Sequence, residues 1–171
     1  MMSMHEFREM RRKNQALSLE ECEAILYARS SGILAVAGDN DYPYTVPLSY
    51  IYHDGKIFFH SARTGHKLDA ISRNDKVSFC VIDQDHVMPQ EYTTYFRSIV
   101  VFGRVRVLED EREKREVLEK LIAKYSPNYV QGGLQEVDKF FPHVCLIELA
   151  IERMTGKEAI ELVRMRDEKE S

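Results

Sequence analysis

The spacing of apolar residues along the chain changes at Gly32. Before this glycine, Ser18 and Glu21 have the spacing of a capping box. Ile25 and Leu26 continue an apolar helix face, which predicts a helix that begins at Ser18 and ends before Gly32. After Gly32, apolar and polar residues alternate with a period near two, as in half-buried strands. The segments with this pattern are 33–37, 45–52, 56–62, 76–82, 97–108 and 144–152.

Short connections between the first three of these segments indicate antiparallel pairing. The links at 38–41 and 53–56 are rich in Gly, Asn and Asp, as in β-hairpins. Parallel strands would need crossover connections of a dozen or more residues. We therefore predict a mainly β fold, an antiparallel barrel or sandwich of six strands with peripheral helices.

Further helices are predicted between and after the strands. Their expected positions are 65–73 with Thr64 as N-cap, a longer helix capped by Asp110 and ended at Ser126, and about 133–141. The charge-dense tail from Ile160 is expected to fray. The predicted organisation is a lead-in over 1–16, one domain over 17–158 and a charged tail over 159–171.

Composition narrows the class of protein. The 171 residues suffice for one domain, and the net charge of −4 with no basic block argues against a nucleic-acid partner. No apolar run is long enough for a membrane span and the start of the chain does not resemble a signal peptide, so we expect no membrane association and a cytoplasmic protein. The widely spaced Cys22, Cys80 and Cys145 are expected to be core thiols, and no metal site is predicted.

The first candidate site is the turn that leads into the predicted helix 65–73. Ser61, Arg63, Thr64 and Lys67 gather there around the permissive Gly65. A helix N-terminus offers unpaired amides and a partial positive charge, which suits a phosphate. Lys67 in the first helical turn is unfavourable unless an anion binds nearby. The alternative is a solvated lysine on a surface turn.

The second candidate is the strand 45–52, which lies in a stretch with four tyrosines and contains Pro47. Proline removes a ladder donor and is confined to sheet edges and bulges. A flat heteroaromatic ligand could lie along this strand, with backbone groups near Pro47 and Leu48 on its polar edge. An edge strand with ordinary aromatic packing is the alternative.

Four sequence motifs in a fixed order resemble one family. They are YPYTVPLSYIY, GKIFFHSARTGHKLDAISRNDKVSFCVI, YFRSIVVFGRVRVLED and IERMTGKEA. Together, over residues 17–158, they resemble the FMN-binding split β-barrel proteins related to pyridoxamine 5′-phosphate oxidase, and more closely the nitroimidazole-resistance branch. The resemblance implies a six-stranded split barrel and a homodimer with FMN in two clefts between the subunits.

The same resemblance implies positions for the cofactor. The isoalloxazine edge would lie along Val46, Pro47, Leu48 and Ser49, and the ribityl phosphate against His60, Ser61, Ala62, His66 and Lys67. Ser98 would come from the partner subunit, and Gly156 and Lys157 match a C-terminal signature of the family. Whether Lys157 and Arg63 contact the cofactor is left open. His60 is the candidate catalytic residue, as a proton donor, or instead a hydrogen-bond partner of the phosphate or ribityl chain.

The activity implied is an FMN-dependent reductase that takes hydride from a donor such as NAD(P)H and reduces small aromatic acceptors such as nitroimidazoles. The resemblance does not extend to the further basic residues and the C-terminal segment that the oxidase itself uses for its pyridoxal substrate, so pyridoxamine oxidation is not expected. Two alternatives stay open. One is a flavin-storing or flavin-sensing protein without turnover, and the other is a haem-binding split barrel with His60 or His143 as axial ligand.

Overall fold

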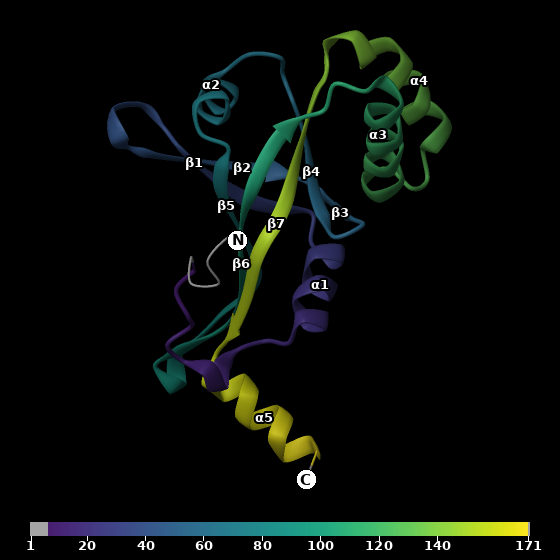
Figure 1. The fold of residues 1–171 in the computed structure, drawn as a ribbon. Helices are drawn as coiled ribbons and strands as arrows, with labels where there is room; N and C mark the ends of the chain where they lie inside the picture. Colours follow the sequence, from purple (N-terminus) through teal and green to yellow (C-terminus); the bar gives the residue numbers. More distant parts are fainter. Residues whose placement is uncertain (1–6, 171) are drawn as a thin grey trace.

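Seven antiparallel strands form one sheet with β2 and β3 at its edges (Figure 1). The computed structural model describes residues 7–170, so residues 1–6 of the expected lead-in and Ser171 of the expected tail lie outside the described part. The strands are β1 (Ser31–Ala37), β2 (Pro43–Ser49), β3 (Ile51–His53), β4 (Lys56–Ser61), β5 (Lys76–Met88), β6 (Thr93–Val107) and β7 (Cys145–Glu158). Their order in the sheet is β2-β1-β5-β6-β7-β4-β3.

The sheet bends around a common core without closing. β2 and β4 contact each other although they are not hydrogen-bonded neighbours. The alternating residues of the strands that point inward fill the space between these two ends of the sheet. The result is an open antiparallel barrel with peripheral helices, and the predicted fold class is confirmed.

The predicted strand 45–52 is two strands, because the backbone leaves the sheet at Tyr50. The Tyr50 N–H donates to the Tyr125 hydroxyl at 2.8 Å, and the Tyr50 hydroxyl donates to the Leu26 carbonyl at 2.9 Å. β2 therefore pairs with β1, whereas β3 pairs with β4. The sequence predicted six strands, and the structure has seven because the predicted strand 45–52 breaks at Tyr50.

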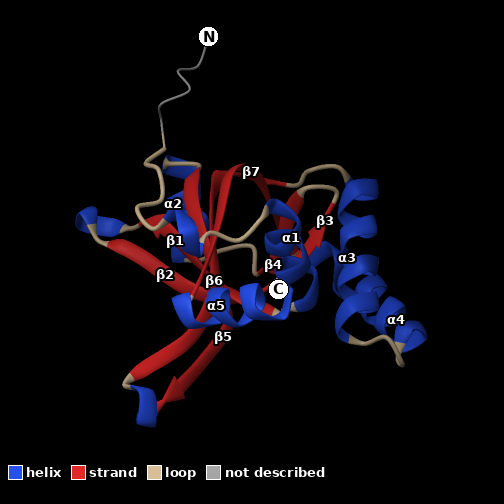
Figure 2. Ribbon diagram, turned by 90° about the horizontal axis from the view of Figure 1, so that it is seen from below, coloured by secondary structure: helices blue, strands red, loops and turns tan. Residues whose placement is uncertain are grey.

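β5 and β6 extend beyond their predicted limits and form a hairpin arm. Their pairing continues past a register irregularity between Ile82 and Gln84 to a short 3-10 turn at Pro89–Glu91. Figure 2 shows the arm projecting from the body of the molecule. Polar residues from Asp83 onward interrupt the apolar alternation, so the predicted strand limits fell short of the arm. The strands continue there because backbone hydrogen bonds between paired strands do not require a buried face.

Five α-helices and four 3-10 turns complete the described chain. The α-helices are α1 (Leu19–Ala28), α2 (His66–Arg73), α3 (Glu111–Tyr125), α4 (Val130–Phe140) and α5 (Ile160–Glu170); the 3-10 turns are Lys13–Gln15, Asp39–Asp41, Pro89–Glu91 and Phe141–His143. The predicted caps Ser18 and Asp110 are confirmed, since each accepts a hydrogen bond from an amide three residues later. Thr64 is not an N-cap, because Gly65 occupies that position with φ of 135°. The tail from Ile160 is helical up to residue 170, contrary to the expected fraying.

Two apolar clusters hold the fold together. The larger one lies inside the barrel and includes Leu34, Phe59, Phe79 and residues of α1 and α2. The second lies between the sheet and the pair α3 and α4, which cover the outer side of β3, β4 and the start of β7 (Figures 1 and 2). All three cysteines are free; Cys22 and Cys145 are buried and Cys80 is half-buried, in keeping with the expected core thiols.

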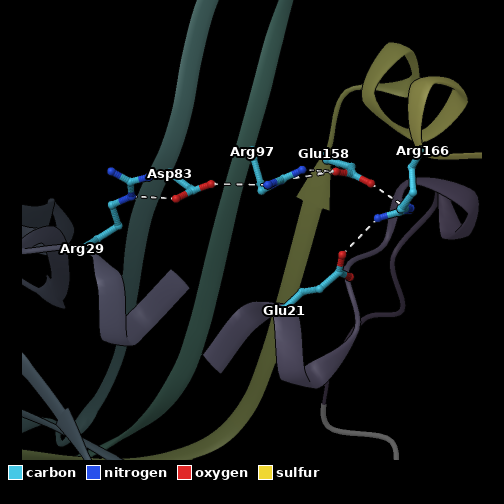
Figure 3. A network of polar contacts seen from close by, with 6 residues as sticks. All are labelled: Glu21, Arg29, Asp83, Arg97, Glu158 and Arg166. Carbon is cyan, nitrogen blue, oxygen red and sulfur yellow. Dashed lines mark hydrogen bonds and ion pairs between the residues drawn. The ribbon is translucent and has the colours of Figure 1, made fainter. Parts of the chain in front are cut away.

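A chain of charged contacts holds α5 to the body (Figure 3). Glu158 is fully buried and lies between two guanidinium groups, with Arg97 Nη2 and Arg166 Nη2 each 2.9 Å from one of its carboxylate oxygens. A buried carboxylate is tolerated when such partners compensate its charge. In order of contact, the charged residues of this network are Arg29, Asp83, Arg97, Glu158, Arg166 and Glu21. Through Arg97, the network also holds β6 to the end of β7 next to Ser98.

Candidate functional site

The N-terminal turn of α2 places a half-buried lysine at one end of the barrel. β4 ends at Ser61, and Gly65 takes a φ of 135° that only glycine adopts readily, so the chain turns sharply into α2 at His66. Burial lowers the pKa of Lys67, and the nearby Cys145 opposes this only in part. Among the described residues no carboxylate lies within ion-pair distance of Lys67. Lys67 is therefore a half-buried lysine without a carboxylate partner in the described part of the chain.

His66 connects this turn to the tyrosine-rich strand. Its ring stacks on Tyr44 of β2 with centroids 4.1 Å apart, and its Nε2 lies 3.7 Å from Asp39 Oδ2. Asp39 also binds Arg73 Nη2 at 2.7 Å, so both ends of α2 contact the tip of the β1–β2 hairpin. The Nε2 atom is buried and makes no hydrogen bond with the described residues. The two candidate features of the sequence are thus neighbours in space.

β2 leaves one row of backbone groups free. The Gly38 N–H donates to the Tyr42 carbonyl, and this bond sets the alternation of hydrogen-bonded pairs along β1 and β2. By that alternation Pro47 and Ile33 form a non-hydrogen-bonded pair, in which the backbone N–H and C=O groups of each residue point away from the other strand. Its missing N–H therefore removes no ladder bond. Backbone groups of Thr45 and Ser49 and the Pro47 carbonyl face the open edge, and the predicted edge position of Pro47 is confirmed.

The side chains of β2 alternate between two surroundings. Val46 and Leu48 pack against the barrel core, whereas Pro47 and Ser49 are exposed on the outer face of the sheet. A planar group beside β2 would accordingly meet its backbone edge, with core side chains on one side of the strand and Pro47 and Ser49 on the other.

The residues at the end of β4 diverge. Ser61 lies opposite Cys145 of the barrel core, whereas His60 lies opposite Leu146 of the outer cluster. Because side chains alternate along a strand, His60 and Ser61 point to opposite faces. Ala62 follows them, exposed, after the strand has ended. The structure therefore brings Ser61, His66 and Lys67 to one end of the barrel and does not place His60 with them.

Arg63 also leaves this group. Its Nη1 donates to the Pro142 carbonyl at 2.8 Å, on the side of α2 that faces α3 and the start of β7. His66 lies instead beside Asp39 at the β1–β2 hairpin. Arg63 and His66 are three residues apart in the sequence, but their side chains lie on different sides of α2.

Ser98 and Lys157 form a directly opposed pair on β6 and β7. Lys157 Nζ lies 5.4 Å from the ring centroid of Phe96. β1 and β5 separate Ser98 from the Pro47 strand, a distance of about 14 Å at three strand spacings. Within one subunit Ser98 and Pro47 are therefore not part of the same cleft.

Sequence reasoning missed Tyr44 and Asp39 as partners of His66. Tyr44 belongs to the tyrosine-rich stretch, but only the strand register and the position of α2 distinguish it from its neighbours. Over residues 7–170 no group of three or more His, Cys, Asp or Glu side chains is arranged to hold a metal ion. In the same range no helix has the length and apolar character needed to cross a membrane.

Comparisons with known proteins agree with this fold. A candidate 5-nitroimidazole antibiotic resistance protein from Bacteroides thetaiotaomicron is 22% identical, with a TM-score of 0.67 over 84% of this chain and 86% of that one. An FAD-binding protein from Mesorhizobium loti is 29% identical, with a TM-score of 0.60 over 85% and 97%. An FAD and heme binding protein from Mycobacterium smegmatis is 20% identical, with a TM-score of 0.72 over 86% and 74%.

No curated protein matches the sequence. The family model described as pyridoxamine 5′-phosphate oxidase matches residues 18–158, which cover the barrel from the cap of α1 to the end of β7. The chain therefore belongs to the pyridoxamine 5′-phosphate oxidase family.

Proposed function

We propose that this chain is an FMN-dependent oxidoreductase that reduces small aromatic acceptors of the nitroimidazole kind. The observation that carries the proposal is Lys67, a half-buried cation without a carboxylate partner among the described residues, placed in the first turn of α2. Solved relatives of the same fold are named as FAD-binding proteins, and one as a candidate nitroimidazole-resistance protein. A flavin phosphate supplies the anion that this site lacks.

The residues present fit such a group. Lys67 and the amides of the first turn of α2 would hold the phosphate, with the Ser61 hydroxyl and the unbonded Nε2 of His66 as further partners. The free backbone groups of β2 at Thr45, Pro47 and Ser49 would bind the polar edge of the ring. The flavin itself would supply two-electron transfer, so the protein's tasks are to bind it, orient it and leave one ring face open to a substrate.

The cofactor cleft is proposed to be shared between two subunits. Ile33, Cys80 and Val100 form a continuous row across the outer faces of β1, β5 and β6, and Pro47 and Thr155 extend this row at its two ends. Ile33 and Phe102 are each 39% exposed there. The Phe7 ring lies against Phe102, with centroids 5.5 Å apart, and the remaining partly exposed apolar sheet face is of a kind typical of protein interfaces. A second copy on this face would bring its Ser98 and Lys157 toward the Pro47 edge.

Absorption spectra test the proposal. The purified protein should show the visible absorption bands of a flavin, or gain them when FMN is added. Anaerobic NADH or NADPH should bleach these bands, and a nitroimidazole should restore them. A protein that stays colourless with added FMN would contradict flavin binding. Bound flavin that neither donor reduces would support a storage protein instead.

Haem binding is the second candidate, because one solved relative is named as an FAD and heme binding protein and another as a flavocytochrome. His60 and His143 are both exposed, and either would be the residue that holds the iron in that case. A Soret band on addition of haem, lost in His60→Ala or in His143→Ala, would establish it. An unchanged spectrum on addition of haem would remove this candidate.

A further inference from the structure

A cavity of about 430 Å³ lies between α2, the start of α3 and the adjoining ends of β6 and β7. This volume falls within the range of small-molecule sites. Its lining consists of Arg63, Leu68, Ile71, Ser72, Val105, Arg106, Val107, Leu108, Lys114, Val144 and Cys145. Aliphatic residues therefore form most of the wall. Three cationic side chains, Arg63, Arg106 and Lys114, also line the cavity, and none of the lining residues is a carboxylate.

Two of the three cations have no anionic partner. Arg106 is neutralised, because its Nη2 lies 2.6 Å from Glu113 and 2.8 Å from Glu148. Arg63 donates to a backbone carbonyl, and Lys114 Nζ lies 4.8 Å from the centroid of the Phe141 ring. Within residues 7–170 neither Arg63 nor Lys114 has a carboxylate at ion-pair distance. Their positive charge faces a mostly apolar cavity.

The pKa of the Cys145 thiol, which lines the cavity, is affected by the same cations. Burial raises its pKa, and Lys114, Lys67 and Arg63 all act to lower it. Arg63 and Lys114 line the cavity and act on this thiol from the turn before α2 and from α3, whereas Lys67 acts on it from the turn proposed to hold the flavin phosphate. In the FMN-loaded protein an anion near Cys145 would experience the attraction of Arg63 and Lys114.

We propose that this cavity binds an aromatic carboxylate of one or two rings. The carboxylate would lie between Arg63 and Lys114, and the rings would cover Leu68, Ile71 and Val105. Charge complementarity selects the head group, and the aliphatic wall selects an apolar body. The site is separate from the proposed flavin ring site: His66 and Tyr44 lie on the flank of α2 that contacts the β1–β2 hairpin, whereas the cavity lies on the flank that faces α3.

Calorimetry with 2-naphthoate and its neutral analogue 2-naphthamide tests the site on protein saturated with FMN, or on the protein as purified if it binds no flavin. Naphthoate should bind and naphthamide should bind at least tenfold more weakly. Arg63→Gln and Lys114→Gln should each weaken naphthoate about tenfold. The control Arg115→Gln removes a charge from the same helix at a residue that pairs with Asp138 outside the cavity, and it should change the affinity less than twofold.

A further variant tests the site without removing a charge, in case Arg63→Gln or Lys114→Gln fails to fold. Ser72 is exposed on α2 at the cavity, so Ser72→Trp should fill the cavity without disturbing the core and abolish naphthoate binding. Equal affinities for naphthoate and naphthamide, or wild-type naphthoate affinity in both Arg63→Gln and Lys114→Gln, would overturn the proposal. Displacement of FMN by naphthoate would also overturn it, because the cavity would then belong to the flavin site.

Discussion

His60 and Ser61 are consecutive residues of β4, and their side chains lie on opposite faces of that strand. Ser61 is opposite Cys145 at the end of the barrel core, and His60 is opposite Leu146 beside the helices that cover the outer face. The strand repeat of two residues makes this separation unavoidable. A single phosphate at the α2 turn is therefore within the surroundings of Ser61 and not of His60.

Substitution of these two neighbours should have different effects on flavin affinity. Ser61→Ala should weaken FMN binding by about 1.5 kcal/mol, the lower range for a hydrogen bond to a charged group. His60→Ala should leave the FMN dissociation constant within about twofold, because its side chain points away from the turn. Fluorescence titration with FMN measures both. The reverse order of effects would show that the phosphate binds on the outer face of β4.

Removal of the Lys67 charge should weaken FMN and spare riboflavin. We expect Lys67→Ala to reduce FMN affinity by about 1.5–3 kcal/mol, because an unshielded phosphate contact is lost. Riboflavin has no phosphate, so its affinity should be nearly the same in the variant and the wild type. Lys120→Ala is the matched control, since Lys120 lies on α3 beside Glu116. Equal losses for FMN and riboflavin would indicate a misfolded variant or a ring contact rather than a phosphate contact.

The buried carboxylate of Glu148 should make stability depend on acid pH. Burial alone would raise its pKa, but hydrogen bonds from Arg106 and Lys56 outweigh burial and hold the pKa below the ordinary 4.5. Because the folded pKa is lowered, the stabilisation is complete above the unfolded pKa and is lost as the pH falls through the folded value. Glu148→Gln should cost about 2 kcal/mol near pH 7.

Urea unfolding of the wild type and Glu148→Gln across the pH range measures this effect. The difference between the two proteins should shrink as the pH falls below about 4.5. The exposed Glu119→Gln serves as a control with little expected change at any pH. A difference that grows toward acid pH would contradict the role of the ionised carboxylate.

Two glycine substitutions should change stability in opposite directions. A Cβ on Gly156 would lie 2.5 Å from Cys22 Sγ and 2.8 Å from Leu17 Cβ, so Gly156→Ala must displace α1 and should destabilise the fold by about 1–3 kcal/mol. Gly132 lies inside α4 with no atom within 4 Å of such a Cβ. Gly132→Ala should therefore stabilise the protein by about 0.5–1 kcal/mol. Thermal unfolding compares the two variants, and a stable Gly156→Ala would mean that α1 is loosely packed.

The apolar outer face should determine the oligomeric state. Ile33→Glu places a charge on the proposed interface and should shift the protein toward monomers in analytical ultracentrifugation. FMN should bind more weakly to this variant if the cleft is shared. Tyr129→Glu is a control away from this face, because Tyr129 is 76% exposed at the N-terminus of α4. A dimer that survives Ile33→Glu with full FMN affinity would place the interface elsewhere.

Much of the fold follows from local sequence rules. The Ser18 and Asp110 caps and the hairpin turns depend on residues within a few positions of each other, and the sequence predicted them correctly. The break at Tyr50 depends on hydroxyl and carbonyl groups of Tyr125 and Leu26, which are distant in the sequence. The length of the β5–β6 arm depends on backbone pairing, which polar side chains do not reveal.

The sequence by itself determined an antiparallel β domain with a basic, glycine-containing turn before α2 and a proline at a sheet edge. Residue type and short-range spacing carry that information. Only the tertiary structure decided that Tyr44 stacks on His66, that Arg63 turns toward Pro142 and that His60 and Ser61 have different surroundings. Each of these depends on strand register and on how α2 packs across the barrel, and therefore on contacts between residues far apart in the chain.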